Sequence, residues 1–94
     1  MAIRILGGKY RSRLLRTPPG HDTRPTRAMV REAVFNMLQG QVRHASALDV
    51  FAGSGSMGFE ALSRGAESVV FCDRRQEAIR VIRDNARILG CEQQ

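Results

Sequence analysis

Cysteine and histidine are scarce in this chain, and their positions exclude two common kinds of site. The two cysteines, Cys72 and Cys91, match neither a disulfide framework nor the spacing of metal ligands, and His21 and His44 lie far apart. A zinc site is therefore not expected. The composition instead predicts free thiols in a reducing compartment, and so a cytoplasmic protein.

Long apolar runs are also missing. None approaches the roughly 20 residues that a membrane-spanning helix needs, and Arg4 interrupts the short apolar start where a signal peptide would lie. The 94 residues, 43% of them hydrophobic, suffice for one small globular domain with a thin core. We therefore expect a soluble fold and no membrane partner.

Acidic residues are few in the first half of the chain, which makes its charge one-sided. Residues 1–44 hold nine basic and two acidic residues, a net charge of +7, whereas residues 45–94 hold six and seven, a net charge of −1. All but one of the basic residues are arginine, whose planar guanidinium can bind phosphate through two hydrogen bonds. This suits a phosphate-bearing partner, but an arginine bias can also come from the base composition of a genome, so the composition alone decides little.

The order of elements predicts an α/β fold. The first segment alternates weakly around Gly7-Gly8, which predicts a β-hairpin-like arm with the glycine pair as its turn. Thr26 can cap a helix that runs to about Gln39. The apolar face predicted for that helix consists of Val30, Ala33, Val34, Met37 and Leu38. A strand at 45–51, a helix at 56–64, a strand at 67–72 and a helix at 75–89 follow. This β-α-β-α order predicts parallel strands joined by a right-handed crossover.

A glycine motif follows the first strand of this unit. Gly53, Gly55 and Gly58 have the G-x-G-x-x-G spacing and stand between the apolar run and a helix start. In such motifs the first glycine permits a tight turn, the second lets the backbone approach a ligand, and the third lets helix and strand pack closely. Asp73 lies 18 residues beyond Gly55, directly after the next strand, where an acid holds a ribose hydroxyl pair in nucleotide-binding folds. The combination predicts a nucleotide-like cofactor.

Asp49 distinguishes between two cofactors. A dinucleotide site has the same glycine spacing, so NAD is a real alternative. An acid within an apolar strand is costly to bury without partners, and in S-adenosylmethionine (SAM) enzymes an acid near the end of this strand organises the turn and the methionine part of the cofactor. Phe51, between Asp49 and Gly53, fits the same class. The residues favour SAM over NAD, and the simpler alternative is that Asp49 only accepts hydrogen bonds from turn amides.

Three segments resemble the small-subunit rRNA guanine-N2 methyltransferases of the RsmD family. They are I-R-I-L-G-G-K-Y-R at 3–11, T-R-P-T at 23–26 with V-R-E-A-V-F-N at 30–36, and L-D-V-F-A-G-S-G-S-M-G-F-E-A-L-S-R-G-A at 48–66. The resemblance runs over nearly the whole chain. It implies an N-terminal β-hairpin arm followed by the first β-α-β-α of a Rossmann-like SAM-dependent methyltransferase fold, with an incomplete parallel sheet.

The resemblance also implies roles for individual residues. The SAM site would be lined by Asp49, Phe51, Gly53, Ser54, Gly55 and Gly58, with Asp73 on the ribose and with Arg24, Pro25 and Thr26 closing over the cofactor from the N-terminal side. The partner would be rRNA or the assembling small ribosomal subunit. The domain organisation would be a basic hairpin arm and loop at 1–25, followed by a truncated methyltransferase domain at 26–94.

One motif of this class of enzyme is missing. Amino-group methyltransferases of this kind use an Asn/Asp-Pro-Pro-aromatic motif, which hydrogen-bonds the exocyclic amine of a flipped base. The adjacent prolines here, Pro18-Pro19, follow Thr17 and precede Gly20. We therefore expect no catalytic residue and no turnover from this chain alone. The intact enzyme would methylate a guanine N2 in small-subunit rRNA.

The basic arm is a candidate RNA-binding element. Arg11, Arg13 and Arg16 alternate along a segment beside Tyr10, and with Lys9 they could follow an RNA backbone. A solvated face is the ordinary explanation of such a run, and the resemblance favours RNA. A non-catalytic RNA-binding fragment and an NAD-binding oxidoreductase fragment remain alternatives. A two-stranded parallel sheet would also leave an open edge, which predicts marginal stability, self-association or dependence on a missing partner segment.

Overall fold

A computed structural model describes residues 2–17, 28–38, 40–50 and 52–91. In chain order these form β1 (Ala2–Arg4), β2 (Leu14–Arg16), α1 (Ala28–Met37), β3 (Ser46–Val50), α2 (Ser56–Ser63), β4 (Ser68–Cys72) and α3 (Gln76–Leu89). The predicted α/β order is confirmed, and from β3 to α3 every boundary lies within one residue of its predicted position.

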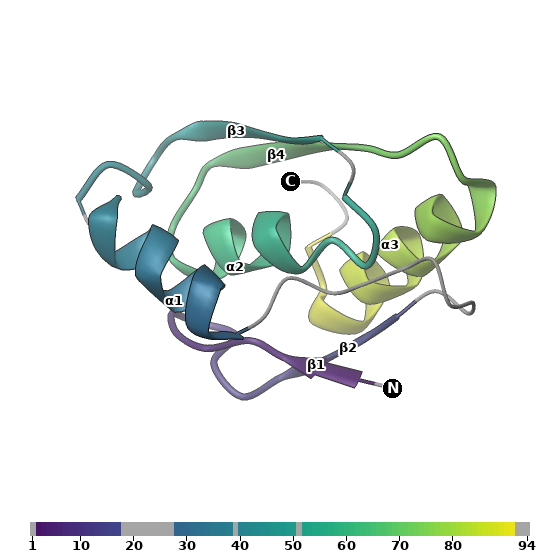
Figure 1. Cartoon of the computed structure of the whole chain (residues 1–94), viewed down its shortest axis with the longest axis horizontal. Coiled ribbons are helices and arrows are strands. Elements are labelled where there is room, and N and C mark those ends of the chain that lie inside the picture. The colour runs from purple at the N-terminus through teal and green to yellow at the C-terminus, as the bar shows by residue number, and fades with distance from the viewer. Residues whose placement is uncertain (1, 18–27, 39, 51, 92–94) are drawn as a thin grey trace.

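The elements stack in three layers (Figure 1). β3 and β4 form a parallel pair, α2 and α3 lie against one face of it, and the antiparallel β1–β2 hairpin lies on the far side of these helices. The parallel register runs from Ser46 opposite Ser68 to Val50 opposite Cys72. Parallel strands need a crossover connection, and α2 supplies it. The predicted hairpin arm and incomplete parallel sheet are thus confirmed.

The hydrophobic core lies around α2. Phe59 and Leu62 of this helix are fully buried, and they belong to one cluster with Ile5 and Leu15 of the hairpin segment and Val69 of β4. The Phe59 and Phe71 rings pack with centroids 4.7 Å apart. Because α2 has the sheet on one side and the hairpin on the other, most of its residues are buried on every face. The hairpin therefore completes the core.

The outer face of the β3–β4 pair is uncovered by the described residues. Alternation along the strands places Leu48, Val50 and Val70 on this face, where each is more than half exposed. β3 pairs only with β4 among the described strands, so its other edge is open. Parallel sheets normally bury both faces. The predicted open edge is present, and its consequence for self-association stays a prediction.

The hairpin turn differs from the predicted two-residue glycine turn. β1 pairs with β2 from Ala2 opposite Arg16 to Arg4 opposite Leu14, and the bonds between Ile5 and the segment 12–13 extend the pairing. The connection therefore spans 6–11, and Gly7-Gly8 lies within it rather than at its tip. Gly8 has a φ of +81°, and a Cβ there would overlap the Ser63 carbonyl of α2. The glycine pair allows the loop to dock on α2.

The buried face of α1 also differs from the predicted one. Val30, Met37 and Leu38 are exposed, whereas Arg31 and Phe35 are buried. The Arg31 guanidinium donates to the Arg4 carbonyl at 2.8 Å and lies 3.8 Å from the buried carboxylate of Glu60. Apolar periodicity predicts the wrong buried face for α1, because it takes no account of the buried acid on α2 beside which the arginine lies.

Candidate functional site

The candidate site lies at the carboxyl ends of β3 and β4, where a glycine loop leads into α2. Gly53 and Gly55 have φ values of +59° and +84°, a region that favours glycine. Gly55 is the N-cap of α2, and its amide donates to the Ala52 carbonyl at 2.8 Å. The carboxyl ends of parallel strands are where open α/β sheets bind ligands. The motif therefore forms the turn that its spacing predicts.

Close packing accounts for the second and third glycines. A Cβ on Gly55 would lie 2.6 Å from the Phe59 ring, and one on Gly58 would overlap the Phe71 ring and lie 2.9 Å from Val69 Cγ1. Gly58 thus lets α2 approach β4, as the motif predicts. Gly55 is required by the packing of Phe59 whether or not a ligand approaches its backbone.

Asp49, on the helix-facing side of β3, is bonded to the start of α2. Its Oδ2 accepts a hydrogen bond from the Gly58 amide at 3.0 Å, which fixes the first turn of the helix relative to the strand. Burial raises the pKa of Asp49, the Gly58 bond lowers it in part, and the nearby charge of Asp73 raises it further. The carboxylate is therefore partnered by one amide and lies in the negative field of a second acid.

Asp73, directly after β4, joins the two loops of the site. Its Oδ2 accepts from the Gly53 amide at 3.0 Å and its Oδ1 from the Arg75 amide at 2.9 Å. Burial alone would raise the pKa of Asp73, but these two amides and the Arg75 guanidinium outweigh it, so the pKa lies below its ordinary value. Asp73 is thus ionised at neutral pH and holds the glycine loop against the end of β4.

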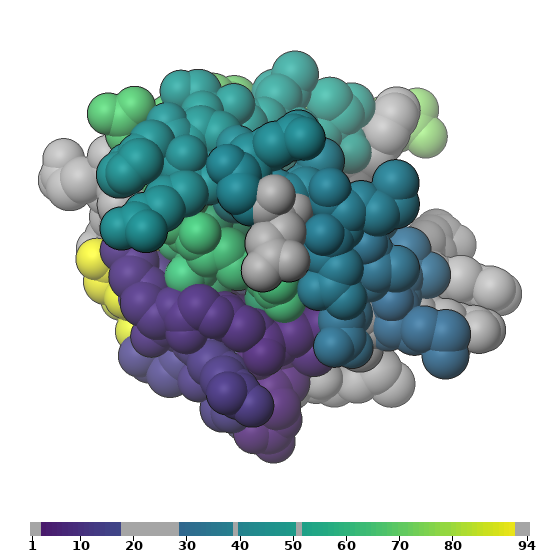
Figure 2. Space-filling model, turned by 90° about the vertical axis from the view of Figure 1, so that its left-hand side faces the viewer, coloured from purple at the N-terminus to yellow at the C-terminus, as the bar shows by residue number. Residues whose placement is uncertain are grey.

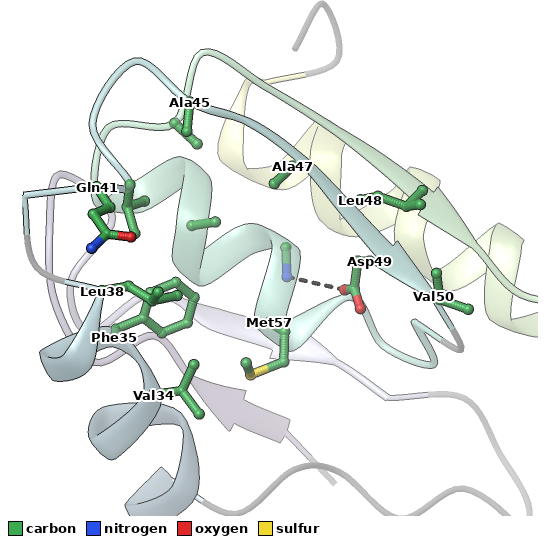
Figure 3. A pocket seen from close by; sticks show the side chains of 14 residues that line it. Val34, Phe35, Leu38, Gln41, Ala45, Ala47, Leu48, Asp49, Val50 and Met57 are labelled. Carbon is green, nitrogen blue, oxygen red and sulfur yellow. Dashed lines mark hydrogen bonds between the residues drawn. The ribbon is translucent and has the colours of Figure 1, made fainter.

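Two cavities flank the strand ends. One, of about 440 Å³, runs between α1, the open edge of β3 and α2, and Asp49 lies at its end beside Met57 (Figure 3). The other, of about 340 Å³, is lined by Val50, Phe71, Cys72, Asp73, Arg74 and Ile79. Each cavity therefore has one of the two acids in its wall, and both acids are bonded to the glycine loop or to the first turn of α2.

Three of the described site residues that the sequence predicts, Gly53, Ser54 and Gly55, do not line these cavities. Ser54 is buried, at 3% exposure, and its carbonyl accepts a hydrogen bond from Asn85 of α3. Arg24, Pro25, Thr26 and Phe51 lie outside the described residues, so their predicted roles stay predictions.

The predicted RNA-binding residues are exposed, but they do not alternate along one strand. Only Arg16 belongs to β2, whereas Lys9 and Arg11 lie in the hairpin connection and Arg13 immediately precedes β2. Arg13 donates to the Ile88 carbonyl at 2.8 Å, and Arg16 lies 3.8 Å from Asp84. The hairpin segment, α1 and the 40–50 segment share one face of the molecule (Figure 2). The predicted alternation fails because the hairpin has a long connection, whose loop docks on α2.

Sequence patterns miss three buried polar residues that fix the hairpin. Glu60 accepts from the Leu6 and Gly7 amides at 2.9 and 3.0 Å, and the Ser63 hydroxyl oxygen accepts from the Tyr10 amide at 2.9 Å. Asn85 bonds to both backbone groups of Arg16. The available signal is the spacing of Asn85, three residues after Ile82 and four before Leu89, which puts a polar side chain on the inner face of α3.

The described part of the chain lacks two kinds of feature. Its helices include none long and apolar enough to cross a membrane. Its His, Cys, Asp and Glu side chains nowhere form a group of three that could hold a metal ion.

Comparison with known proteins places the chain among bacterial relatives. The Ribosomal RNA small subunit methyltransferase D of Haemophilus influenzae is 39% identical over 89 residues, which are 95% of this chain and 46% of that protein. The protein of the same name from Escherichia coli K12 is 52% identical over 64 residues, 68% of this chain and 32% of that protein. The solved structure of E. coli yhhF has a TM-score of 0.87 at 40% identity, over 96% of this chain and 49% of that one.

The chain thus spans less than half the length of these curated relatives. The family model described as Conserved hypothetical protein 95 matches residues 3–94. This match covers nearly the whole chain, and it agrees with the relatives and with the resemblance in the three sequence segments. The chain therefore belongs to the Conserved hypothetical protein 95 family, which is the RsmD family.

Proposed function

We propose that this chain is the cofactor-binding half of a SAM-dependent methyltransferase that acts on a guanine N2 of small-subunit rRNA. The observation that carries the proposal is the pair of acids at the carboxyl ends of β3 and β4, each bonded to an amide of the glycine motif. Relatives named Ribosomal RNA small subunit methyltransferase D support the reaction and the rRNA substrate.

The chemistry of these acids fits SAM. SAM carries a sulfonium and an ammonium cation and a ribose hydroxyl pair, all of which carboxylates can bind. Each carboxylate oxygen can accept more than one hydrogen bond, so the amide bonds leave further capacity on Asp49 and Asp73. When bound, SAM would supply an electrophilic methyl group. Asp73 would bind the ribose, Asp49 would orient the methionine part, and the glycine loop would set their separation.

The hairpin arm would bring the RNA to this half. Lys9, Arg11, Arg13 and Arg16 are exposed along it, and arginine side chains bind phosphate oxygens well. These contacts would position the RNA without reading its sequence. We expect the chain alone to bind SAM without methyl transfer, because its sequence holds no Asn/Asp-Pro-Pro-aromatic motif.

Calorimetric titration tests the cofactor assignment. The chain should bind SAM and its demethylated product, S-adenosylhomocysteine, and should not bind NAD. Asp73→Ala should weaken SAM binding at least about tenfold, because a charge-assisted hydrogen bond contributes roughly 1.5–3 kcal/mol. Asp84→Ala, at a partly exposed acid of α3, is the matched control and should leave the affinity unchanged. Binding of NAD but not of SAM would refute the assignment.

Salt-dependent RNA binding tests the arm. Binding of a small-subunit rRNA fragment should weaken with salt, with a slope of roughly 0.7–0.9 in log–log units per phosphate contacted. Substituting Arg11, Arg13 and Arg16 by alanine should reduce that slope. The same change at Arg80, Arg83 and Arg87 of α3 removes equal charge and should leave most of the slope. Equal losses in both triple variants would mean that net charge, and not the arm, binds RNA.

A further inference from the structure

Asn85 is the buried polar residue that bonds to both proposed binding segments. It lies on α3, at 0% exposure. Its Oδ1 accepts from the Arg16 amide at 2.8 Å, and its Nδ2 donates to the carbonyls of Arg16 and Ser54, both at 3.0 Å. Arg16 ends β2 of the hairpin, and Ser54 lies between the two positive-φ glycines of the loop. One side chain therefore joins segments that are 38 positions apart in sequence.

The bonds to Arg16 resemble those of a neighbouring strand. A side-chain amide carries a carbonyl acceptor and two N–H donors, so it can pair with both backbone groups of one residue and retain a donor for a third group. In Asn85 that remaining donor reaches the Ser54 carbonyl. Without the Asn85 side chain, the Arg16 and Ser54 carbonyls would each lose a hydrogen bond in the interior, which costs free energy. Bonds to either segment thus depend on the same side-chain orientation.

Other contacts of the hairpin reach the helices without reaching the loop. Glu60 and Ser63 of α2 bond to the 6–10 segment. The Ile88 carbonyl of α3 accepts a hydrogen bond from Arg13 of the hairpin segment. Among the hydrogen bonds between described residues, Asn85 is the one of these anchoring groups that also bonds to residues 52–55. A change in the position of β2 would therefore alter the hydrogen bond that Asn85 makes to the glycine loop.

We propose that Asn85 is a positioning residue that links the hairpin arm to the glycine loop, so that the two segments gain and lose order together. The link between the two segments follows from the hydrogen bonds alone. Only the identity of their ligands, SAM for the loop and RNA for the arm, rests on the proposed function. Ordering of the loop by SAM would reduce the entropy that RNA binding must still remove from the arm, and the reverse holds for RNA.

Hydrogen exchange of the whole chain tests the link without any ligand. Asn85→Leu removes all three bonds and nearly preserves volume. The amides of Arg16, Gly53 and Gly55 should then exchange at least about tenfold faster, while those of Val69 and Val70 in β4 stay within about threefold. Asp84→Asn is the matched control, because it alters the ion pair with the Arg16 side chain and leaves the backbone bonds intact.

A second variant separates the two halves of the link. Asn85→Asp keeps an oxygen that can accept from the Arg16 amide and loses both donors. The loop amides should therefore exchange faster than in the unchanged chain, while the Arg16 amide remains protected. Loop amides that stay slow in both variants would overturn the proposal. So would a uniform acceleration of all amides, or failure of both variants to fold, since either would assign Asn85 to global stability.

Ligand binding supplies the remaining readout. SAM affinity should fall about tenfold in Asn85→Leu although Asn85 lies outside the proposed SAM-binding set, and it should stay within about twofold in Asp84→Asn. Retained SAM affinity together with fast loop exchange would contradict the positioning role. If the unchanged chain binds no SAM, the proposed function fails, and the exchange measurements still decide whether the link exists.

Discussion

Replacing Glu60 by glutamine removes a buried charge with almost no change in side-chain volume. Glu60 is fully buried on α2, where its carboxylate accepts from the Leu6 and Gly7 amides and from Arg64 Nε at 2.9 Å. The Arg31 guanidinium lies 3.8 Å away and is itself 3% exposed. One carboxylate therefore holds the hairpin connection, α1 and the end of α2 together.

The expected loss follows from the groups left behind. Glutamine keeps one acceptor oxygen but presents an NH₂ group to donors, so at least one amide loses its partner, at a cost of about 1–3 kcal/mol. Breaking a buried ion pair costs about 3–5 kcal/mol, because the remaining charge stays buried. Desolvation lowers the pKa of Arg31, and the charge of Glu60 raises it. The substitution therefore removes the charge that offsets the cost of burying the Arg31 guanidinium. We expect a loss of at least about 2 kcal/mol in the free energy of unfolding.

Urea denaturation followed by far-ultraviolet circular dichroism measures this loss, since the chain has no tryptophan. A loss of 2 kcal/mol corresponds to a fall in Tm of about 8–16 °C for a domain of this size. Glu67→Gln changes an exposed acid before β4 and should stay within about 0.5 kcal/mol. A Glu60→Gln variant as stable as the Glu67→Gln control would refute the claim that this carboxylate anchors the hairpin.

Three further predictions concern the site and the sheet. The folded-state pKa of Asp73 lies below its ordinary value of 3.8, so its ionised form stabilises the fold above that value and the contribution is lost as pH falls through the folded pKa. Asp73→Asn should therefore lower Tm at neutral pH and converge with the unchanged chain in acid; a difference that does not vary with pH would contradict this. Gly58→Ala should lower the free energy of unfolding by about 1–3 kcal/mol, because its Cβ would overlap Phe71 and Val69; an unchanged urea midpoint would count against that packing. The chain should sediment as larger species at higher concentration, and Leu48→Lys on the uncovered sheet face should reduce this more than Met29→Lys on α1; a monomer at every concentration would exclude self-association.

The β-α-β-α part of the fold could be predicted because its signals are local. β3 and β4 are short apolar runs, and α2 and α3 are followed by glycines that end them. Ile82 and Leu89, which are seven residues apart and so lie on one side of a helix, are both buried on α3. The buried face of α1 could not be predicted in the same way, because Arg31 enters the interior through Glu60, an acid on another element.

The candidate site likewise has one part that could be predicted from residue spacing and another that could not. The spacing of Gly53, Gly55 and Gly58, with Asp49 before them and Asp73 after the next strand, is sufficient to expect a loop flanked by two acids. The sequence allowed for Asp49 to accept from amides of the turn, but it did not identify the Gly58 amide as the donor. It also did not indicate that Asp73 joins the Gly53 and Arg75 amides. Those partners depend on how closely α2 approaches the strands, which packing on Phe71 and Val69 determines.

The sequence by itself determined the class of fold, the glycine turn and the resemblance to the RsmD family, because periodicity and residue spacing carry that information along the chain. Only the tertiary structure decided how the hairpin joins the rest. Glu60, Ser63 and Asn85 are polar residues whose burial depends on backbone groups more than 50 positions away. No local pattern specifies such a pairing, since it forms only when the hairpin covers α2 and α3 and each buried polar group must find its partner there.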